Sequence, residues 1–116
     1  DVGFIVLGEL VNRVGGRPVD EFARANTFEP LRLSDTGYTP GASLKPRLAP
    51  TGVRGGKPIV GEVHDPRAFA LGGVAGHAGL FGTADDLGRF ARMLLRGGEL
   101  DGARVLKPGT VKLLTE

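Results

Sequence analysis

Glycine crowds one short stretch of this 116-residue chain, immediately before a helical pattern begins. The five glycines fall within eleven positions and are Gly72, Gly73, Gly76, Gly79 and Gly82. Glycine accepts positive φ and close backbone approach, both of which a Cβ atom forbids. Loops of this kind commonly carry sites, so residues 72–82 are predicted to form a tight turn beside a site, with His77 as their one titratable side chain.

A helix is predicted to follow this glycine-rich turn, over residues 83–96. Thr83 can accept hydrogen bonds from the free amides of the first turn, and Asp85 and Asp86 complement the positive end of the helix dipole. Apolar residues recur at helical spacing on one face and arginines on the other: Leu87, Phe90, Ala91, Leu94 and Leu95 against Arg89, Arg92 and Arg96. The spacing predicts that the apolar face packs on a core and that the arginines face solvent.

Two more helices are predicted in residues 1–36, as a helical hairpin. The apolar spacing predicts a helix over residues 2–14 that ends at the glycine pair 15–16. Pro18 at the first helical position, followed by two acidic residues, predicts a second helix over residues 18–26. The residues expected to face inward are Leu7, Leu10, Val11 and Val14 in the first helix, and Val19, Phe22 and Ala23 in the second.

Residues 37–65 are predicted to form a long loop with one short strand at 58–63. Six glycines and four prolines fall between Gly37 and Gly61. Unstructured loops above ~15 residues are uncommon in compact domains unless they bind something or are held by structure outside the segment. Residues 66–116 are expected to hold a helical turn at 66–71, the glycine-rich turn, the helix at 83–96 and a last helix at 108–116. The fold class is therefore mainly α with long loops.

Composition argues against several classes of partner. The 15 basic and 13 acidic residues leave a net charge of +2, too weak to steer the chain to nucleic acid or a membrane surface. No cysteine is present, so disulfides and thiolate metal sites are excluded. No apolar run reaches the ~20 residues of a membrane span. Helical patterns are interrupted at both termini, so we expect an internal piece of a larger protein, whose compartment, extracytoplasmic or cytoplasmic, stays open.

Nucleophilic catalysis by a serine requires an activating base close by. Ser34 is followed at the third position by Gly37, and Ser43 by Pro46, so neither has the Ser-x-x-Lys spacing. His64, Asp65 and His77 suggest either a metal site or a base with an orienting carboxylate, but their spacing matches no known metal site. No metal is predicted, and His77 is favoured as a polar residue that lines a cleft.

Five segments carry a resemblance to a known family, and they are residues 1–11, 16–22, 28–38, 61–65 and 72–87. In order and spacing they resemble the serine β-lactamase-related family, which includes class C β-lactamases, penicillin-binding carboxypeptidases, D-aminopeptidases and esterases. The resemblance covers essentially the whole chain. It implies the helical central portion of an α+β β-lactamase/transpeptidase-like fold whose sheet lies largely outside this chain.

The resemblance also implies roles for particular residues. The family uses the serine of a Ser-x-x-Lys helix, a Tyr-x-Asn or Tyr-Ser-Asp motif for proton transfer, and a late Lys-Thr-Gly or His-x-Gly strand for substrate binding. Asp1 corresponds to the last position of Tyr-Ser-Asp, and the other two motifs are not found in this chain. An Asp there is an acceptor that is usually charged, in place of an amide. His77, Gly76, Gly79 and His64 are expected to line the substrate cleft.

The activity implied for the parent protein is that of a serine hydrolase. It would form an acyl-serine intermediate on a β-lactam, a D-amino-acid peptide or an ester, without a cofactor, and this chain alone would be inactive. The expected partners are the substrate and the missing remainder of its own domain, with a homodimer also considered. A non-catalytic module that binds cell-wall or peptide ligands on the same scaffold, and a purely structural interaction domain, stay open as alternatives.

Overall fold

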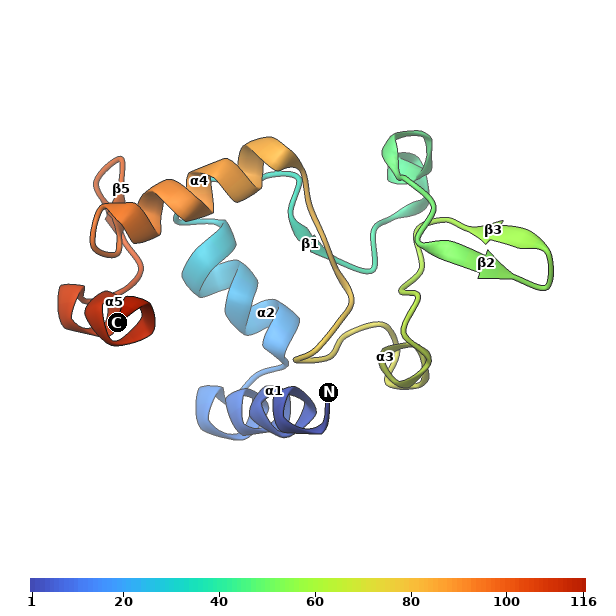
Figure 1. Cartoon of the computed structure of the whole chain (residues 1–116), viewed down its shortest axis with the longest axis horizontal. Helices are drawn as coiled ribbons and strands as arrows, with labels where there is room; N and C mark the ends of the chain where they lie inside the picture. Colours follow the sequence, from blue (N-terminus) through green and yellow to red (C-terminus); the bar gives the residue numbers. More distant parts are fainter. The chain divides into compact units, whose positions relative to one another are not determined.

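The computed structural model describes all 116 residues, which divide into two compact units (Figure 1). Unit 1 consists of Asp1–Phe22 and Gly37–Phe81, and unit 2 of Ala23–Thr36 and Gly82–Glu116. The chain therefore enters each unit twice. None of its helices combines the length and the apolar character that crossing a membrane requires.

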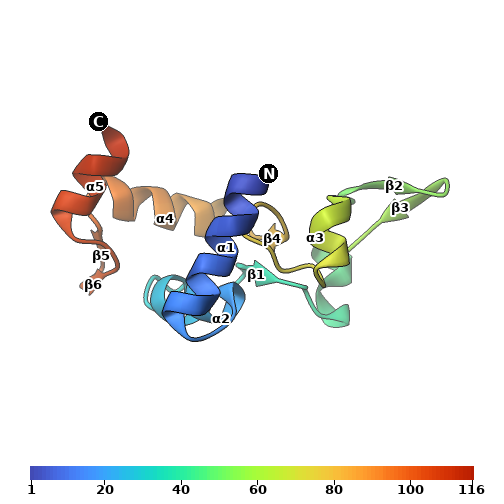
Figure 2. The same cartoon turned by 90° about the horizontal axis from the view of Figure 1, so that it is seen from below.

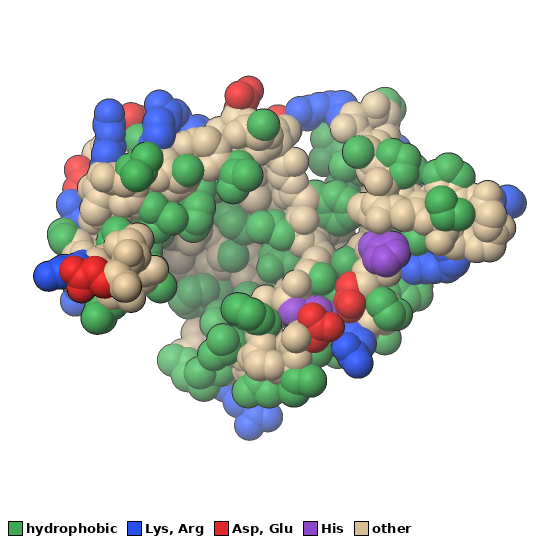
Figure 3. Space-filling view, viewed as in Figure 1, with side chains coloured by type: hydrophobic (Ala, Val, Ile, Leu, Met, Phe, Trp, Pro, Cys, Tyr) green, Lys and Arg blue, Asp and Glu red, His purple; other side chains and the backbone are tan.

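Unit 1 begins with helix α1 (Val2–Gly15), which ends at Gly16 in the left-handed conformation, with φ 69°. The predicted inward stripe is wrong in its orientation, because Leu7, Leu10 and Val14 are all more than half exposed. The one buried residue of the helix is Gly8. Figure 3 shows hydrophobic side chains over α1 on the visible face. The physical reason is that α1 packs through glycine backbone rather than through its large apolar side chains.

The middle of unit 1 contains more structure than the predicted loop. A short 3₁₀ helix (Ala42–Arg47) precedes an antiparallel hairpin of β2 (Gly52–Arg54) and β3 (Lys57–Ile59), seen in Figures 1 and 2. Gly55 and Gly56, with φ 58° and 75°, form its two-residue turn. Two successive residues with positive φ match the twist of a hairpin, so a glycine pair favours this turn. The predicted strand at 58–63 is correct at its start only.

The remaining elements of unit 1 surround a small apolar core. β1 (Gly37–Tyr38) pairs antiparallel with β4 (Leu80–Phe81), and helix α3 (Pro66–Ala70) forms where a helical turn is predicted. The core consists of three buried residues, with Ala78 packed against them: Val63, Ala68 and Ala75. These small side chains bring α3 and the glycine-rich turn close together.

Helix α2 (Val19–Ala23) is followed directly by a π-helical turn (Arg24–Phe28), where the sequence predicts one helix over residues 18–26. Unit 2 contains this π turn, helix α4 (Ala84–Leu95), a hairpin of β5 (Glu99–Leu100) and β6 (Ala103–Arg104), and helix α5 (Pro108–Thr115). Its buried core contains four side chains: Leu31, Leu33, Met93 and Leu100.

The predicted faces of α4 are correct in part, because Phe90 and Leu94 pack against the core of unit 2 and Arg92 and Arg96 are exposed. Thr83 caps the helix by accepting a hydrogen bond from Asp86 N at 3.2 Å, but Leu87 and Leu95 are exposed while Asp86 and Met93 are buried. The reason is polar: Asp86 Oδ2 accepts from Asp35 N at 2.9 Å and from Thr36 Oγ1 at 2.8 Å. Arg89, predicted to face solvent, donates from Nε to the Leu31 carbonyl oxygen at 2.7 Å. The hydrogen bonds of Asp86 and Arg89 thus shift the buried face of α4 from the predicted one.

Candidate functional site

The glycine-rich turn lies directly against α1. A Cβ atom placed on Gly8 would lie 2.9 Å from Gly76 N, and one placed on Gly76 would overlap the Phe4 carbonyl oxygen. Only glycine fits such a backbone contact. Gly76 is therefore held against the first half of α1 within unit 1.

His77 follows Gly76 and bonds to the start of α3. Its side chain is only 3% exposed, and its Nε2 lies 2.8 Å from Asp65 Oδ1. The same oxygen accepts the Ala68 amide at 2.8 Å, so Asp65 is also the N-cap of α3. The Ala68 hydrogen bond, then the one from His77, hold the pKa of Asp65 below its ordinary value. Asp65 is thus a charged acceptor at neutral pH.

The surroundings of the imidazole define which of its nitrogen atoms donates a hydrogen bond. Because ionised Asp65 can only accept, His77 Nε2 must carry the proton. His77 Nδ1 is buried and has no hydrogen-bond partner. The pair has the composition of a base with its orienting carboxylate, but in this chain the second ring nitrogen is enclosed.

Asp1 is also held by α3. It occupies the N-cap position of α1, yet its side chain makes no capping hydrogen bond. Asp1 Oδ2 instead accepts from Arg67 Nη1 of α3 at 3.1 Å, and both side chains are more than half exposed. Arg67 is two residues from Asp65, so this short helix contacts Asp1 with one residue and His77 with another.

The other predicted site residues lie apart from this network. Gly79 is buried with φ 112°, and a Cβ there would overlap the Gly73 carbonyl oxygen, so it closes the turn. His64 is exposed, and its ring lies against Gly52, where a Cβ would overlap it. Tyr38 is the chain's one tyrosine; burial, with a smaller contribution from the Asp20 charge, raises its pKa. Its phenol therefore stays protonated at neutral pH.

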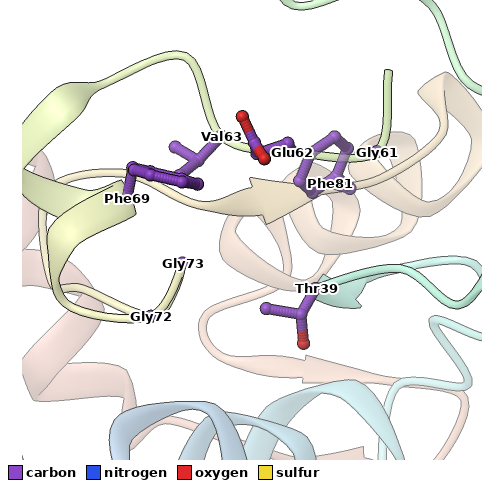
Figure 4. A pocket seen from close by; sticks show the side chains of 8 residues that line it. All are labelled: Thr39, Gly61, Glu62, Val63, Phe69, Gly72, Gly73 and Phe81. Carbon is purple, nitrogen blue, oxygen red and sulfur yellow. The ribbon is translucent and has the colours of Figure 1, made fainter. Parts of the chain in front are cut away.

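Two cavities lie within unit 1. One, of about 180 Å³, lies beside the glycine-rich turn (Figure 4) and is lined by Thr39, Gly61, Glu62, Val63, Phe69, Gly72, Gly73 and Phe81. The other, of about 450 Å³, lies along α1 and includes Gly76. His64, His77 and Gly79 line neither cavity. No group of three or more His, Asp or Glu side chains is arranged to hold a metal ion.

Sequence reasoning missed Arg67 and Thr39. The Asp-Pro pair at 65–66 is a local signal for a helix start, because Asp caps and Pro suits the first helical position. Nothing local indicates that Arg67 binds Asp1, 66 residues away. Thr39 has φ 43°, a rare conformation for a β-branched residue, and no sequence feature predicts it.

Comparison with known proteins identifies the relatives of this chain. A relative from Bacillus subtilis (strain 168), named "N-acetylmuramyl-L-alanine amidase", is 32% identical over 99% of this chain and 30% of its own length. One from Escherichia coli (strain K12), named "Putative D-alanyl-D-alanine carboxypeptidase", has the same identity and coverage. The chain therefore spans 30% of the length of these curated relatives.

A solved structure shares the fold. The "putative beta-lactamase" from Bacteroides dorei DSM 17855 matches with a TM-score of 0.57 at 23% identity, over 90% of this chain and 24% of that chain. The predicted helical portion of a β-lactamase fold is thereby confirmed. The family model described as Beta-lactamase matches residues 1–116, so the chain belongs to this family.

Proposed function

We propose that this chain is the central helical part of a serine hydrolase domain that forms an acyl-serine intermediate on an amide or an ester. The observation that carries the proposal is the Beta-lactamase family match over every residue. Two relatives named as an amidase and a carboxypeptidase support a hydrolytic parent that acts on cell-wall peptides or their analogues. The complete domain is this chain together with the remainder of the family fold.

In the proposed reaction, a serine from the rest of the domain attacks the substrate carbonyl carbon. The serine proton passes to a base and then to the leaving amine or alcohol, and water later hydrolyses the acyl-serine ester. Neither Ser34 nor Ser43 has a lysine at the third following position, so this chain does not supply that nucleophile. The chain alone should therefore be inactive.

Within this scheme, Asp1 is the proposed reaction-site residue of the chain. A carboxylate in the last position of the Tyr-Ser-Asp motif accepts hydrogen bonds and attracts an ammonium group, such as a lysine beside the nucleophile. Gly76, His77, Gly79 and His64 are proposed to form or support the wall of the substrate cleft. The backbone contact of Gly76 and the hydrogen bond of His77 support this role, because they hold the glycine-rich turn against α1 and α3.

The experiment is acylation of the complete domain. It is incubated with a β-lactam, a D-Ala-D-Ala peptide or a chromogenic ester, and intact mass spectrometry detects the covalent adduct. One acyl group per domain, lost when the modified serine is replaced by alanine, is the expected result. The 116-residue chain, treated identically, should give no adduct and no burst of product.

Two outcomes would contradict the proposal. An adduct or burst from the chain alone would show that the nucleophile lies within it. A complete domain that binds muropeptides tightly but neither acylates nor turns over any of the three substrate classes would instead be a binding module on the hydrolase scaffold.

A further inference from the structure

We propose that Arg67 and the Asp65–His77 pair are positioning residues, which fix the Asp1 carboxylate relative to the glycine-rich turn through the short helix α3. The inference rests on the proposed function, because that function makes Asp1 a reaction-site residue. It adds a role for three side chains that the proposed reaction does not itself require.

The first observation is that the Asp1 carboxylate bonds to α3 and does not cap α1. An aspartate at an N-cap ordinarily accepts a hydrogen bond from an amide in the first helical turn. Asp1 makes no such bond and pairs with Arg67 Nη1 at 3.1 Å. The hydrogen bond of this carboxylate therefore goes to α3 and not to its own helix.

The second observation is that one oxygen atom fixes both α3 and the turn. Asp65 Oδ1 accepts from the Ala68 amide and from His77 Nε2, each at 2.8 Å. The His77 ring is almost completely buried, and its other nitrogen has no partner. The imidazole thus has one specific polar contact, and that contact links residue 77 to the first turn of α3.

The third observation is that these contacts form a closed ring. α1 contacts the glycine-rich turn at Gly8 and Gly76, the turn contacts α3 through His77 and Asp65, and α3 contacts the start of α1 through Arg67. A displacement of any one element has to move the other two. Such a ring can hold a carboxylate to the tolerance that catalysis requires, where a misplacement of about 1 Å can reduce the rate ~10²-fold.

The test measures kcat per acylated site in the complete domain, so that misfolded enzyme does not count. Arg67→Ala and Asp65→Ala should each reduce kcat by about 10- to 100-fold with KM nearly unchanged, because positioning acts in the transition state. The conservative changes Arg67→Lys and Asp65→Asn keep a cation and an acceptor, and should restore part of the rate. Arg13→Ala is the matched control, since Arg13 pairs with Glu9 on the exposed side of α1.

A spectroscopic measurement tests the His77 link independently of turnover. The ¹⁵N signals of the imidazole, assigned by their loss in His77→Gln, should show a proton on Nε2 and should change in Asp65→Ala. A ring without a proton on Nε2 in the unmodified domain would overturn the assigned link.

The kinetic outcomes separate this inference from the proposed function. If the unmodified domain acylates while Arg67→Ala and Asp65→Ala keep its kcat per acylated site, the positioning role is wrong and the hydrolase function stands. If the unmodified domain fails to acylate any substrate class, both are overturned together.

Discussion

Replacing Asp86 by alanine tests whether polar contacts, rather than leucines, set the rotation of α4. Asp86 is 6% exposed, and its Oδ2 atom accepts two hydrogen bonds, from Asp35 N and Thr36 Oγ1. Hydrogen bonds to charged groups each contribute ~1.5–3 kcal/mol to the free energy of unfolding. Asp35 and Thr36 are partly accessible and can regain water, which places the loss at the lower end, ~3 kcal/mol in total.

The assay is urea unfolding followed by circular dichroism. With m ~1–3 kcal/mol per M, a loss of ~3 kcal/mol lowers the midpoint by about 1–3 M. Asp86→Asn keeps an oxygen that can accept both hydrogen bonds and should lose only the charge contribution, ~1 kcal/mol. Asp85→Ala is the matched control: Asp85 is the exposed neighbour in the same turn, and its removal should cost at most ~1 kcal/mol through the helix dipole.

Equal effects of the Asp86 and Asp85 substitutions on the urea midpoint would refute this reasoning. If Asp86→Ala and Asp85→Ala lower the midpoint by the same amount, the two long-range hydrogen bonds contribute nothing and the rotation of α4 has another cause. A large loss in Leu87→Ala would point to the same conclusion, because Leu87 is 67% exposed and should tolerate truncation.

Three further predictions concern unit 1. Gly76→Ala should lower the melting temperature by an amount equivalent to ~1–3 kcal/mol, because the new methyl overlaps the Phe4 carbonyl oxygen, whereas Gly109→Ala, with nothing within 4 Å, should not. The pKa of Asp65 is lower in the folded chain than in the unfolded chain, so the ionised carboxylate stabilises the fold above the unfolded pKa and this stabilisation is lost as pH falls. Between pH ~5 and ~3 the melting temperature should therefore decrease less in Asp65→Asn than in the unmodified chain. The isolated chain should associate through the exposed apolar side chains of α1, and Phe4→Asp should shift its sedimentation towards the monomer; a sharp, concentration-independent melt of a monomer would contradict this.

The end of α1 and the start of α4 could be predicted from the sequence because their signals are local. The glycine pair at 15–16 ends α1, and Thr83 caps α4 as its position indicates. The hairpin turn at Gly55 and Gly56 had an equally local signal, and the expectation of one long loop overlooked it. Sequence pattern can predict a cap or a turn when the interacting atoms lie within about four residues of each other.

The buried face of α4 could be predicted only in part. Phe90 and Leu94 pack on the core as expected, but partners far along the chain decide how Asp86 and Arg89 are placed. Asp86 bonds Asp35 and Thr36 about fifty residues earlier, and Arg89 reaches Leu31 across 58 residues. The apolar spacing predicted that Arg89 faces solvent, because charged side chains are expected on the hydrated face of a helix. The guanidinium instead satisfies the Leu31 carbonyl and also pairs with Asp101, so its burial is compensated.

The same distinction explains the candidate site. The sequence pattern indicated that the glycines of residues 72–82 allow close backbone approach, but it could not indicate the partners. In the structure Gly76 lies against α1, and Gly79 lies against Gly73. His77 stood out as the polar residue of this turn, yet its ring bonds inward to Asp65. In the proposed positioning role, His77 links the glycine-rich turn to α3, and the glycines allow that turn to approach α1 closely.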